Sequence, residues 1–197
     1  MAAPPEVTMH DFTGSWLLNK TLSDSFDSAF VLQGIPWIIR KVISLATLTM
    51  KIAHSVDESG VPTVIFTQAA SVAIAGLSEE IETRWLDGRE QLHSSSLFGT
   101  SSARTRMICF DTATGYDGKP LDAVLTKDFL REGKEGEEEF LFDLVVHQTR
   151  GWVMEQIWGF GMLNGERRLL RKMGLKKGGE AVYVTAWYDW KGRDDGD

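Results

Sequence analysis

Hydrophobic and polar residues change their spacing once along this chain, near residue 45. Before that point, large apolar side chains recur three or four residues apart, as on one face of a helix. The pattern predicts a short strand, Gly14–Leu18, followed by two compact helices within Ser23–Leu45. Ser23 or Asp24 is a suitable cap for the first helix, and Gly34 is suited to end it.

From Leu48 onward the period is two, and the pattern predicts strands joined by short turns. Asp87 and Gly88 form a strong hairpin signal, whereas Leu121–Leu130 fits either a strand or a helix. About ten antiparallel strands of this kind predict a mainly β protein, a single closed β-barrel with an N-terminal helix–turn–helix lid. The strands expected after the helices are Leu48–Ser55, Thr63–Thr67, Glu80–Trp85, Glu90–Ser96, Arg104–Phe110, Phe140–Gln148, Trp152–Phe160, Arg167–Met173 and Val182–Trp190.

Length and composition fit this picture. A chain of 197 residues predicts one domain, with an ordered core over residues 12–190 and loose ends at 1–11 and 191–197. The net charge of −7 argues against nucleic-acid binding. No segment reaches the roughly 18 apolar residues of a membrane span, so no membrane insertion is expected. Cys109 is the single cysteine, which favours a reducing, cytoplasmic location, and we expect a monomer or weak dimer.

The start of the chain resembles the calycins, and most closely the intracellular fatty-acid-binding proteins. In that family a Gly-x-Trp strand precedes a two-helix lid that carries Phe, Gly, Arg-Lys and then Ala before the second strand. The resemblance implies a lipocalin-like barrel around a cavity for a hydrophobic small molecule. The matching positions are Gly14, Trp16, Phe26, Phe30, Gly34, Ile35, Arg40, Lys41 and Ala46.

Two departures from that family bear on the ligand. Its members hold a fatty-acid carboxylate with an Arg-x-Tyr on the last strand and a second Arg two strands earlier. Here Tyr188 stands at the tyrosine position, but Ala186 and Ile157 stand where the arginines are expected. A buried carboxylate without a cation is costly, so we expect a neutral ligand, terpenoid- or polyketide-like. The expected ligand-binding residues are Phe26, Phe30, Trp37, Met50, Ile157, Ala186 and Tyr188.

Three residues are candidates for acid–base chemistry. Alternation from the inward Leu48 and Met50 places His54 on the inner face, although a solvated position at the strand end is the alternative. Glu155 shares the face of Ile157; if that face is internal, Glu155 is a carboxylate in an apolar cavity and a candidate general acid or base. Tyr188 adds a hydroxyl group.

Other polar residues alternate along strands without a clear side. We expect Glu80, Glu82 and Arg84 to lie on the outer surface as cross-strand ion pairs, together with the arginines of Arg104–Phe110. The face of Asp143 and His147 fits solvent better than a cavity, although barrel interiors are often mixed.

Two hypotheses about function remain. The first is a barrel that binds a hydrophobic, neutral small molecule in its cavity. The second is a cofactor-independent cyclase or isomerase of secondary metabolism that works in the same barrel by shaping its substrate. The chain has no nucleophile elbow, phosphate loop or dinucleotide-binding glycine pattern, and its four histidines are too scattered to predict a metal site. We therefore expect no metal and no cofactor.

Overall fold

The computed structural model describes residues 1–71, 79–132 and 139–193. It is a mainly β structure of ten antiparallel strands with three helices. This architecture confirms the predicted barrel and lid. In chain order the elements are β1 (Gly14–Leu18), α1 (Asp27–Leu32), α2 (Trp37–Leu45), β2 (Leu48–Val56), β3 (Pro62–Ala70), β4 (Glu79–Trp85), β5 (Gln91–Ser95), β6 (Gly99–Ile108), α3 (Ala123–Thr126), β7 (Phe140–His147), β8 (Trp152–Leu163), β9 (Glu166–Lys177) and β10 (Glu180–Gly192).

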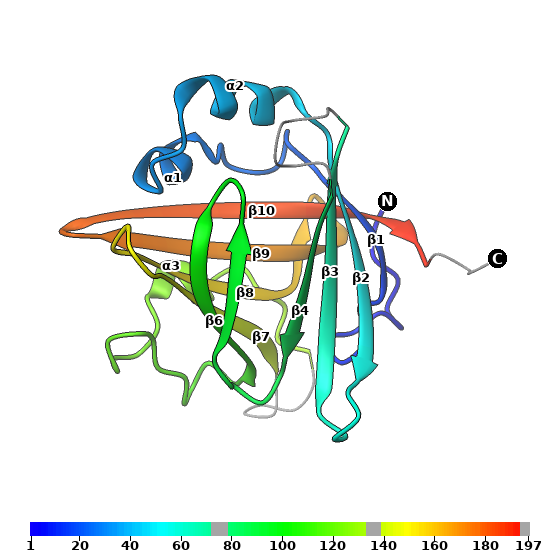
Figure 1. Ribbon diagram of the computed structural model, residues 1–197. Coiled ribbons are helices and arrows are strands. Elements are labelled where there is room, and N and C mark those ends of the chain that lie inside the picture. The colour runs from blue at the N-terminus through cyan, green and yellow to red at the C-terminus, as the bar shows by residue number, and fades with distance from the viewer. Residues whose placement is uncertain (72–78, 133–138, 194–197) are drawn as a thin grey trace.

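The strands form one sheet in the order β4-β3-β2-β1-β10-β9-β8-β7-β6-β5. Figure 1 shows β9 and β10 running across the view and β2 to β4 running up and down, so that the sheet curves round on itself. The barrel is nearly but not fully closed. Its edge strands β4 and β5 make no backbone ladder within the described residues. Helices α1 and α2 lie over one end of the barrel (Figure 1).

Trp16 anchors the packed core of the barrel. Its side chain is fully buried, and its Nε1 atom donates a hydrogen bond of 3.1 Å to the Phe12 carbonyl oxygen. Its ring lies against Trp190 and Phe160, with centroids 4.6 and 6.2 Å away. Strand β1 pairs with β2 on one side and with β10 on the other, so that Trp16 stands opposite both Met50 and Trp190. The Gly-x-Trp motif thus joins the two ends of the chain in the core.

The first helix begins later than the sequence predicts. Ser23 and Asp24 do not cap it; their side chains accept hydrogen bonds of 2.8 Å from the backbone N–H groups of Trp187 and Thr185 on β10. These bonds tie the approach to the lid onto the barrel rim, and α1 starts only at Asp27. Gly34 has φ +79°, a backbone conformation that favours glycine, where the chain turns between α1 and α2.

The N-terminal segment 1–11 is packed rather than loose. Ala3 and Val7 are buried, and the Ala3 N–H group donates a 2.7 Å hydrogen bond to the Arg167 carbonyl oxygen. Arg167 in turn donates to the Pro4 and Val7 carbonyl oxygens. The sequence pattern missed this segment because it is too short and irregular to show a period. Of the predicted loose tail, residues 194–197 lie outside the described part of the chain.

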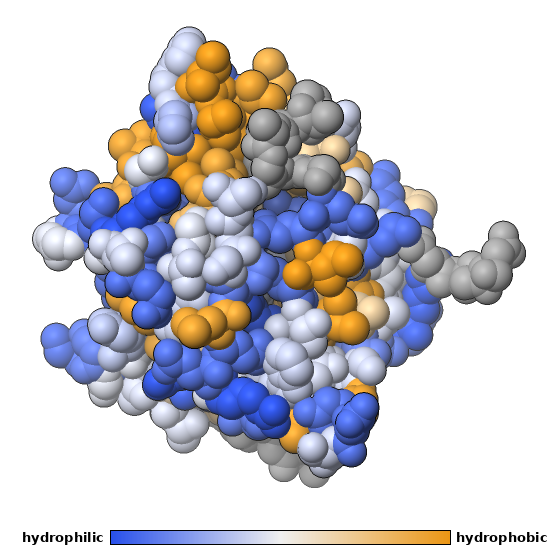
Figure 2. Space-filling model, viewed as in Figure 1, coloured by the Kyte–Doolittle hydropathy of each residue, from blue (hydrophilic) through white to orange (hydrophobic). Residues whose placement is uncertain are grey.

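The outer surface differs between the lid and the walls. Figure 2 shows hydrophobic side chains gathered at the lid end, whereas most of the visible wall is hydrophilic. The large exposed apolar residues of the lid are Val31, Trp37, Ile38 and Leu45. Within the described residues, no helix combines the length and apolar character required to cross a bilayer.

Candidate functional site

A cavity of about 190 Å³ lies inside the barrel under helix α1. Aromatic rings form much of its wall. The Trp158 ring stacks against both Phe66 and Tyr188, with centroids 5.3 and 5.8 Å away. On the lid side Phe26 and Phe30 stack on each other at 5.9 Å, and both line the cavity. Such a wall fits a hydrophobic ligand, because aromatic side chains present large rigid apolar surfaces.

Four of the seven predicted ligand-binding residues line this cavity: Phe26, Phe30, Met50 and Tyr188. The Tyr188 hydroxyl has no hydrogen-bond partner among the described residues, which leaves it free to bond a ligand. The remaining three predicted residues do not line the cavity. Trp37 is 62% exposed on the outside of the lid, and Ala186 is fully buried in the core. Ile157 lies on the outer face of β8.

The structure corrects the face assigned to β8. Met154, Gln156 and Trp158 line the cavity, so that Glu155 and Ile157 point the other way. The predicted alternation is right, but its phase is shifted by one residue, and such a shift exchanges the two faces of a strand. Ile157 packs in an apolar cluster outside the barrel, together with Leu125 of α3.

Glu155 is therefore buried outside the cavity. One carboxylate oxygen accepts a 2.7 Å hydrogen bond from the Tyr116 N–H group, and the other lies 3.0 Å from Lys176 Nζ. The carboxylate holds the connection between β6 and β7 against the barrel wall. This is a structural position, in which it meets no cavity ligand.

His54 also lies away from the cavity. Its ring contacts the edge of the Phe12 ring at 4.7 Å, and its buried Nε2 atom has no partner among the described residues. Burial lowers the pKa of His54 below its ordinary value of 6.5, which favours the neutral ring. The inner-face prediction for β2 holds at Met50, but His54 stands farther along the strand, where residues of the N-terminal segment fill the space.

The polar part of the cavity comes from residues that the sequence pattern placed on the surface. Glu80, Glu82 and Arg84 of β4 all line the cavity, as does Asp143 of β7. The other face of β4 leaves Ile81 60% exposed. Alternation alone does not tell the two faces apart when a barrel has a polar interior. The exposed arginines of β6, by contrast, lie outside as expected.

Asp143 organises one side of the cavity. Its carboxylate accepts hydrogen bonds from Thr105 Oγ1 at 2.8 Å and from Gln156 Nε2 at 2.9 Å. Arg84 Nε lies 3.7 Å from the same carboxylate, and Arg84 also pairs with Glu82. These carboxylates hold the pKa of Arg84 above its ordinary value despite its burial. His147, on the same strand, is buried too, but it bonds the Phe98 carbonyl oxygen and caps the next turn.

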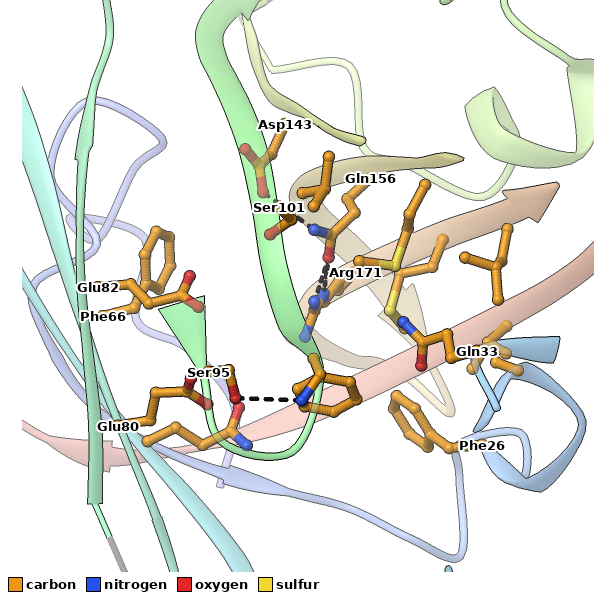
Figure 3. Close-up of a pocket in the computed structure, with 18 of the residues that line it drawn as sticks. Phe26, Gln33, Phe66, Glu80, Glu82, Ser95, Ser101, Asp143, Gln156 and Arg171 are labelled. Carbon is orange, nitrogen blue, oxygen red and sulfur yellow. Dashed lines mark hydrogen bonds between the residues drawn. The ribbon is translucent and has the colours of Figure 1, made fainter. Parts of the chain in front are cut away.

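A second polar group closes the seam between β4 and β5. His93 Nε2 lies 3.0 Å from a Glu80 oxygen and 3.2 Å from a Glu82 oxygen. In Figure 3, Glu80 and Glu82 lie on one side of the pocket, and Asp143, Gln156 and Arg171 lie on the other. Side chains thus bridge the strands that make no backbone ladder.

The seam group is also the set of described residues that could hold a metal ion. One donor atom each from Glu80, Glu82 and His93 lie within 4.8 Å of one another. The imidazole is already shared by both carboxylates, and Glu82 is shared with Arg84. Its members therefore already have polar partners among the described residues, including the ion pair of Glu82 with Arg84.

Comparisons with known proteins identify the family. No protein-family model matches the chain. A pericyclase, pydY, from Acremonium sp is 30% identical over 193 residues, covering 98% of this chain and 98% of that protein. A probable pericyclase, scpY, from Mollisia scopiformis is 29% identical over 191 residues, covering 97% and 95%. The chain belongs to the same family as these pericyclases.

Solved structures agree on the fold of this family member. Fatty-acid-binding protein 1 of Echinococcus granulosus matches with a TM-score of 0.57 at 12% identity, covering 92% of this chain and 98% of that one. Lipid binding protein 8 of Caenorhabditis elegans matches with a TM-score of 0.55 at 14% identity, covering 94% and 99%. The calycin resemblance inferred from the Gly-x-Trp strand and the lid is confirmed as a likeness of fold.

Proposed function

We propose that this chain is a pericyclase that binds a hydrophobic small molecule in its barrel and closes a ring on it. The observation that carries the proposal is the full-length similarity to two pericyclases. The aromatic cavity supports it, because its rigid rings can shape a flexible substrate. The proposal corresponds to the second of the two hypotheses drawn from the sequence, and ligand binding is its first step.

The chemistry makes modest demands on the protein. In a pericyclic ring closure, π electrons of one molecule become new σ bonds in a single cyclic shift. No proton, electron or leaving group enters or departs, so the atoms and electrons balance within the substrate. The main obstacle is that the reacting ends must meet in one conformation. Holding them together in a near-attack conformation removes the entropic cost of restricting the internal rotations of the substrate.

The walls of the cavity are suited to this task. Trp158 and its ring partners Phe66 and Tyr188 form a rigid apolar surface against which a flexible chain can fold. The unpartnered Tyr188 hydroxyl would act as a catalytic hydrogen-bond donor to a substrate carbonyl conjugated with the reacting bonds. Such a bond strengthens as electron density shifts onto the carbonyl oxygen in the transition state.

The test is a reaction of the purified chain with the substrate of the Acremonium pericyclase, without added cofactor. We expect ring closure above the uncatalysed rate. Tyr188→Phe should lower kcat by about 100-fold, the lower end of the range for a lost transition-state donor. Arg104→Gln, a change on the outer wall, should have no effect. Tight substrate binding without any rate increase would instead make the protein a carrier.

The cavity is formed within one chain, which supports a monomer or weak dimer as the working form. The single cysteine supports a cytoplasmic location, and the negative net charge supports the absence of a nucleic-acid partner.

A further inference from the structure

Arg171 projects into the cavity from β9. In the sheet register it stands directly opposite Trp158 on β8 and Ala186 on β10. Its guanidinium lies 4.6 Å from the centre of the Trp158 ring, a cation–π contact, and it lines the cavity. No cation stands at position 186, but Arg171, the residue paired with Ala186 in the sheet, is a cation that lines the cavity.

The polar partner of Arg171 is neutral. Both hydrogen bonds from its guanidinium, through Nε and Nη2, go to the side-chain oxygen of Gln156. An arginine carries five N–H donors, so three remain for a ligand. Among the described residues, no carboxylate lies within ion-pair distance of Arg171. Arg84, by contrast, faces both Glu82 and Asp143.

Gln156 is held so that its oxygen faces Arg171. Its Nε2 atom donates to Asp143 Oδ2 at 2.9 Å, and Asp143 Oδ1 accepts from Thr105 Oγ1 at 2.8 Å. All three residues of this relay are at most 5% exposed. In Figure 3 the labelled side chains Asp143, Gln156 and Arg171 follow one another along one side of the pocket. The relay orients the guanidinium without neutralising it, because an amide carries no charge.

We propose that Arg171 is a specificity residue that binds an anionic oxygen of the substrate, a carboxylate or an enolate. A half-buried guanidinium still gains most from a charged oxygen, which it can meet with two parallel hydrogen bonds. The expectation of a neutral ligand rested on Ala186 and Ile157 alone, and Arg171 removes its basis. The inference relies on the proposed function only for the statement that the substrate occupies this cavity.

A competition assay tests the inference without any turnover. Nile red, a neutral dye, reports occupancy of the cavity, and three competitors share a long apolar chain. Oleate carries a carboxylate, 2-dodecanoylcyclohexane-1,3-dione carries an enolate, and oleyl alcohol is neutral. At neutral pH we expect oleate or the dione to displace the dye at a concentration about tenfold below that of oleyl alcohol. Whichever of the two anions displaces the dye at the lower concentration identifies whether the site prefers a carboxylate or an enolate.

Two variants attribute this preference to Arg171. Arg171→Gln should remove the tenfold preference and leave displacement by oleyl alcohol within about twofold of the unmodified protein. Arg171→Lys should keep only part of the preference, because lysine retains the positive charge but cannot form two parallel hydrogen bonds to the anion. Arg104→Gln, an exposed arginine on β6, is the matched control and should keep the preference.

Equal displacement by the anions and the alcohol in the unmodified protein would overturn the inference, as would an equal loss in Arg104→Gln. The outcome is separate from that of the turnover assay. Anion preference without ring closure would refute the proposed reaction and keep the role of Arg171. Ring closure without anion preference would do the reverse.

Discussion

The two faces of the wall formed by β8 and β9 both carry charged side chains, but these side chains have different partners. On the outer face, Lys172 is 2% exposed and its Nζ atom lies 2.7 Å from an Asp128 oxygen. Glu155 on the same face pairs with Lys176. On the inner face, the hydrogen bonds of Arg171 within the described residues go to the neutral amide of Gln156, and its guanidinium lies over the Trp158 ring. On the outer face both members of each ion pair come from the chain, and the pairs have a structural role. On the inner face the chain supplies the cation alone, and the remaining donors of Arg171 can bind a ligand.

The outer face is covered by the connection between β6 and β7, including α3. Gly115 lies so close to Glu155 that an added Cβ atom would stand 2.3 Å from a carboxylate oxygen. Leu125 of α3 is fully buried against the same wall. This layer brings oppositely charged partners to the charges of the outer face, whereas no described carboxylate of the cavity pairs with Arg171.

The largest effect on stability should come from breaking an outer pair. Glu155→Ala leaves the Tyr116 N–H group and Lys176 without their acceptor, and we expect a loss of about 3 kcal/mol in the free energy of unfolding by urea. Nile red binding should stay within about twofold, because Glu155 does not line the cavity. Glu90→Ala removes an exposed pair with Arg104 and should leave the free energy of unfolding almost unchanged. A loss of dye binding with unchanged stability would contradict the comparison.

A second outer contact predicts a pH dependence. The Tyr183 hydroxyl donates a hydrogen bond to Asp122, and this bond raises the pKa of Tyr183 from 10.0 to about 12. Because the pKa in the folded state is the higher one, the stabilisation is complete below pH 10 and is lost as the pH rises towards 12. Tyr183→Phe should cost about 1 kcal/mol at neutral pH and make the alkaline loss of stability shallower.

The ultraviolet absorbance of tyrosinate measures the ionisation of Tyr183 directly, since the chain has only three tyrosines. The transition near pH 12 should disappear in Tyr183→Phe and remain in Tyr116→Phe, whose side chain is exposed. A transition that persists in Tyr183→Phe would show that another tyrosine causes it.

The sequence predicted the fold better than the site. The change of period near residue 45 and the Gly-x-Trp strand were sufficient for the barrel and its lid. Strand β6 begins at Gly99, five residues before Arg104 where it was expected, because its buried first half is made of small polar residues such as Ser101 and Ser102. No hydrophobic alternation marks such a segment.

The site was harder to predict because this barrel has a polar interior. On β4 the charged face of Glu80 and Glu82 turns inward and Ile81 turns outward, the reverse of the usual expectation. On β8 the predicted alternation was out of phase by one residue, so that it placed Glu155 on the cavity face where Gln156 stands. Arg171 gave no signal of its own, since basic residues occupy both faces of β9. Only the register that places it opposite Ala186 reveals its role.

The smallest change in stability should come from removing the charge of Arg171 on the inner face. Arg171→Met keeps an unbranched side chain against Trp158 and removes a cation that no described carboxylate balances. We expect the free energy of unfolding to stay within about 1 kcal/mol or to rise, as when a poorly paired buried charge gives way to an apolar side chain. Lys172→Met, at the adjacent residue on the outer face, deprives Asp128 of its partner and should cost about 1–2 kcal/mol.

Urea unfolding of both variants, together with the oleate competition assay, decides between the two faces. Arg171→Met should lose the preference for anions while its stability is kept, and Lys172→Met should lose stability while the preference is kept. A marked loss of stability in Arg171→Met would show that the relay from Asp143 through Gln156 serves the packing of the wall. Arg171 and Lys172 would then differ only in the kind of partner, an amide for Arg171 and a carboxylate for Lys172. Arg171 would have no role in binding a ligand.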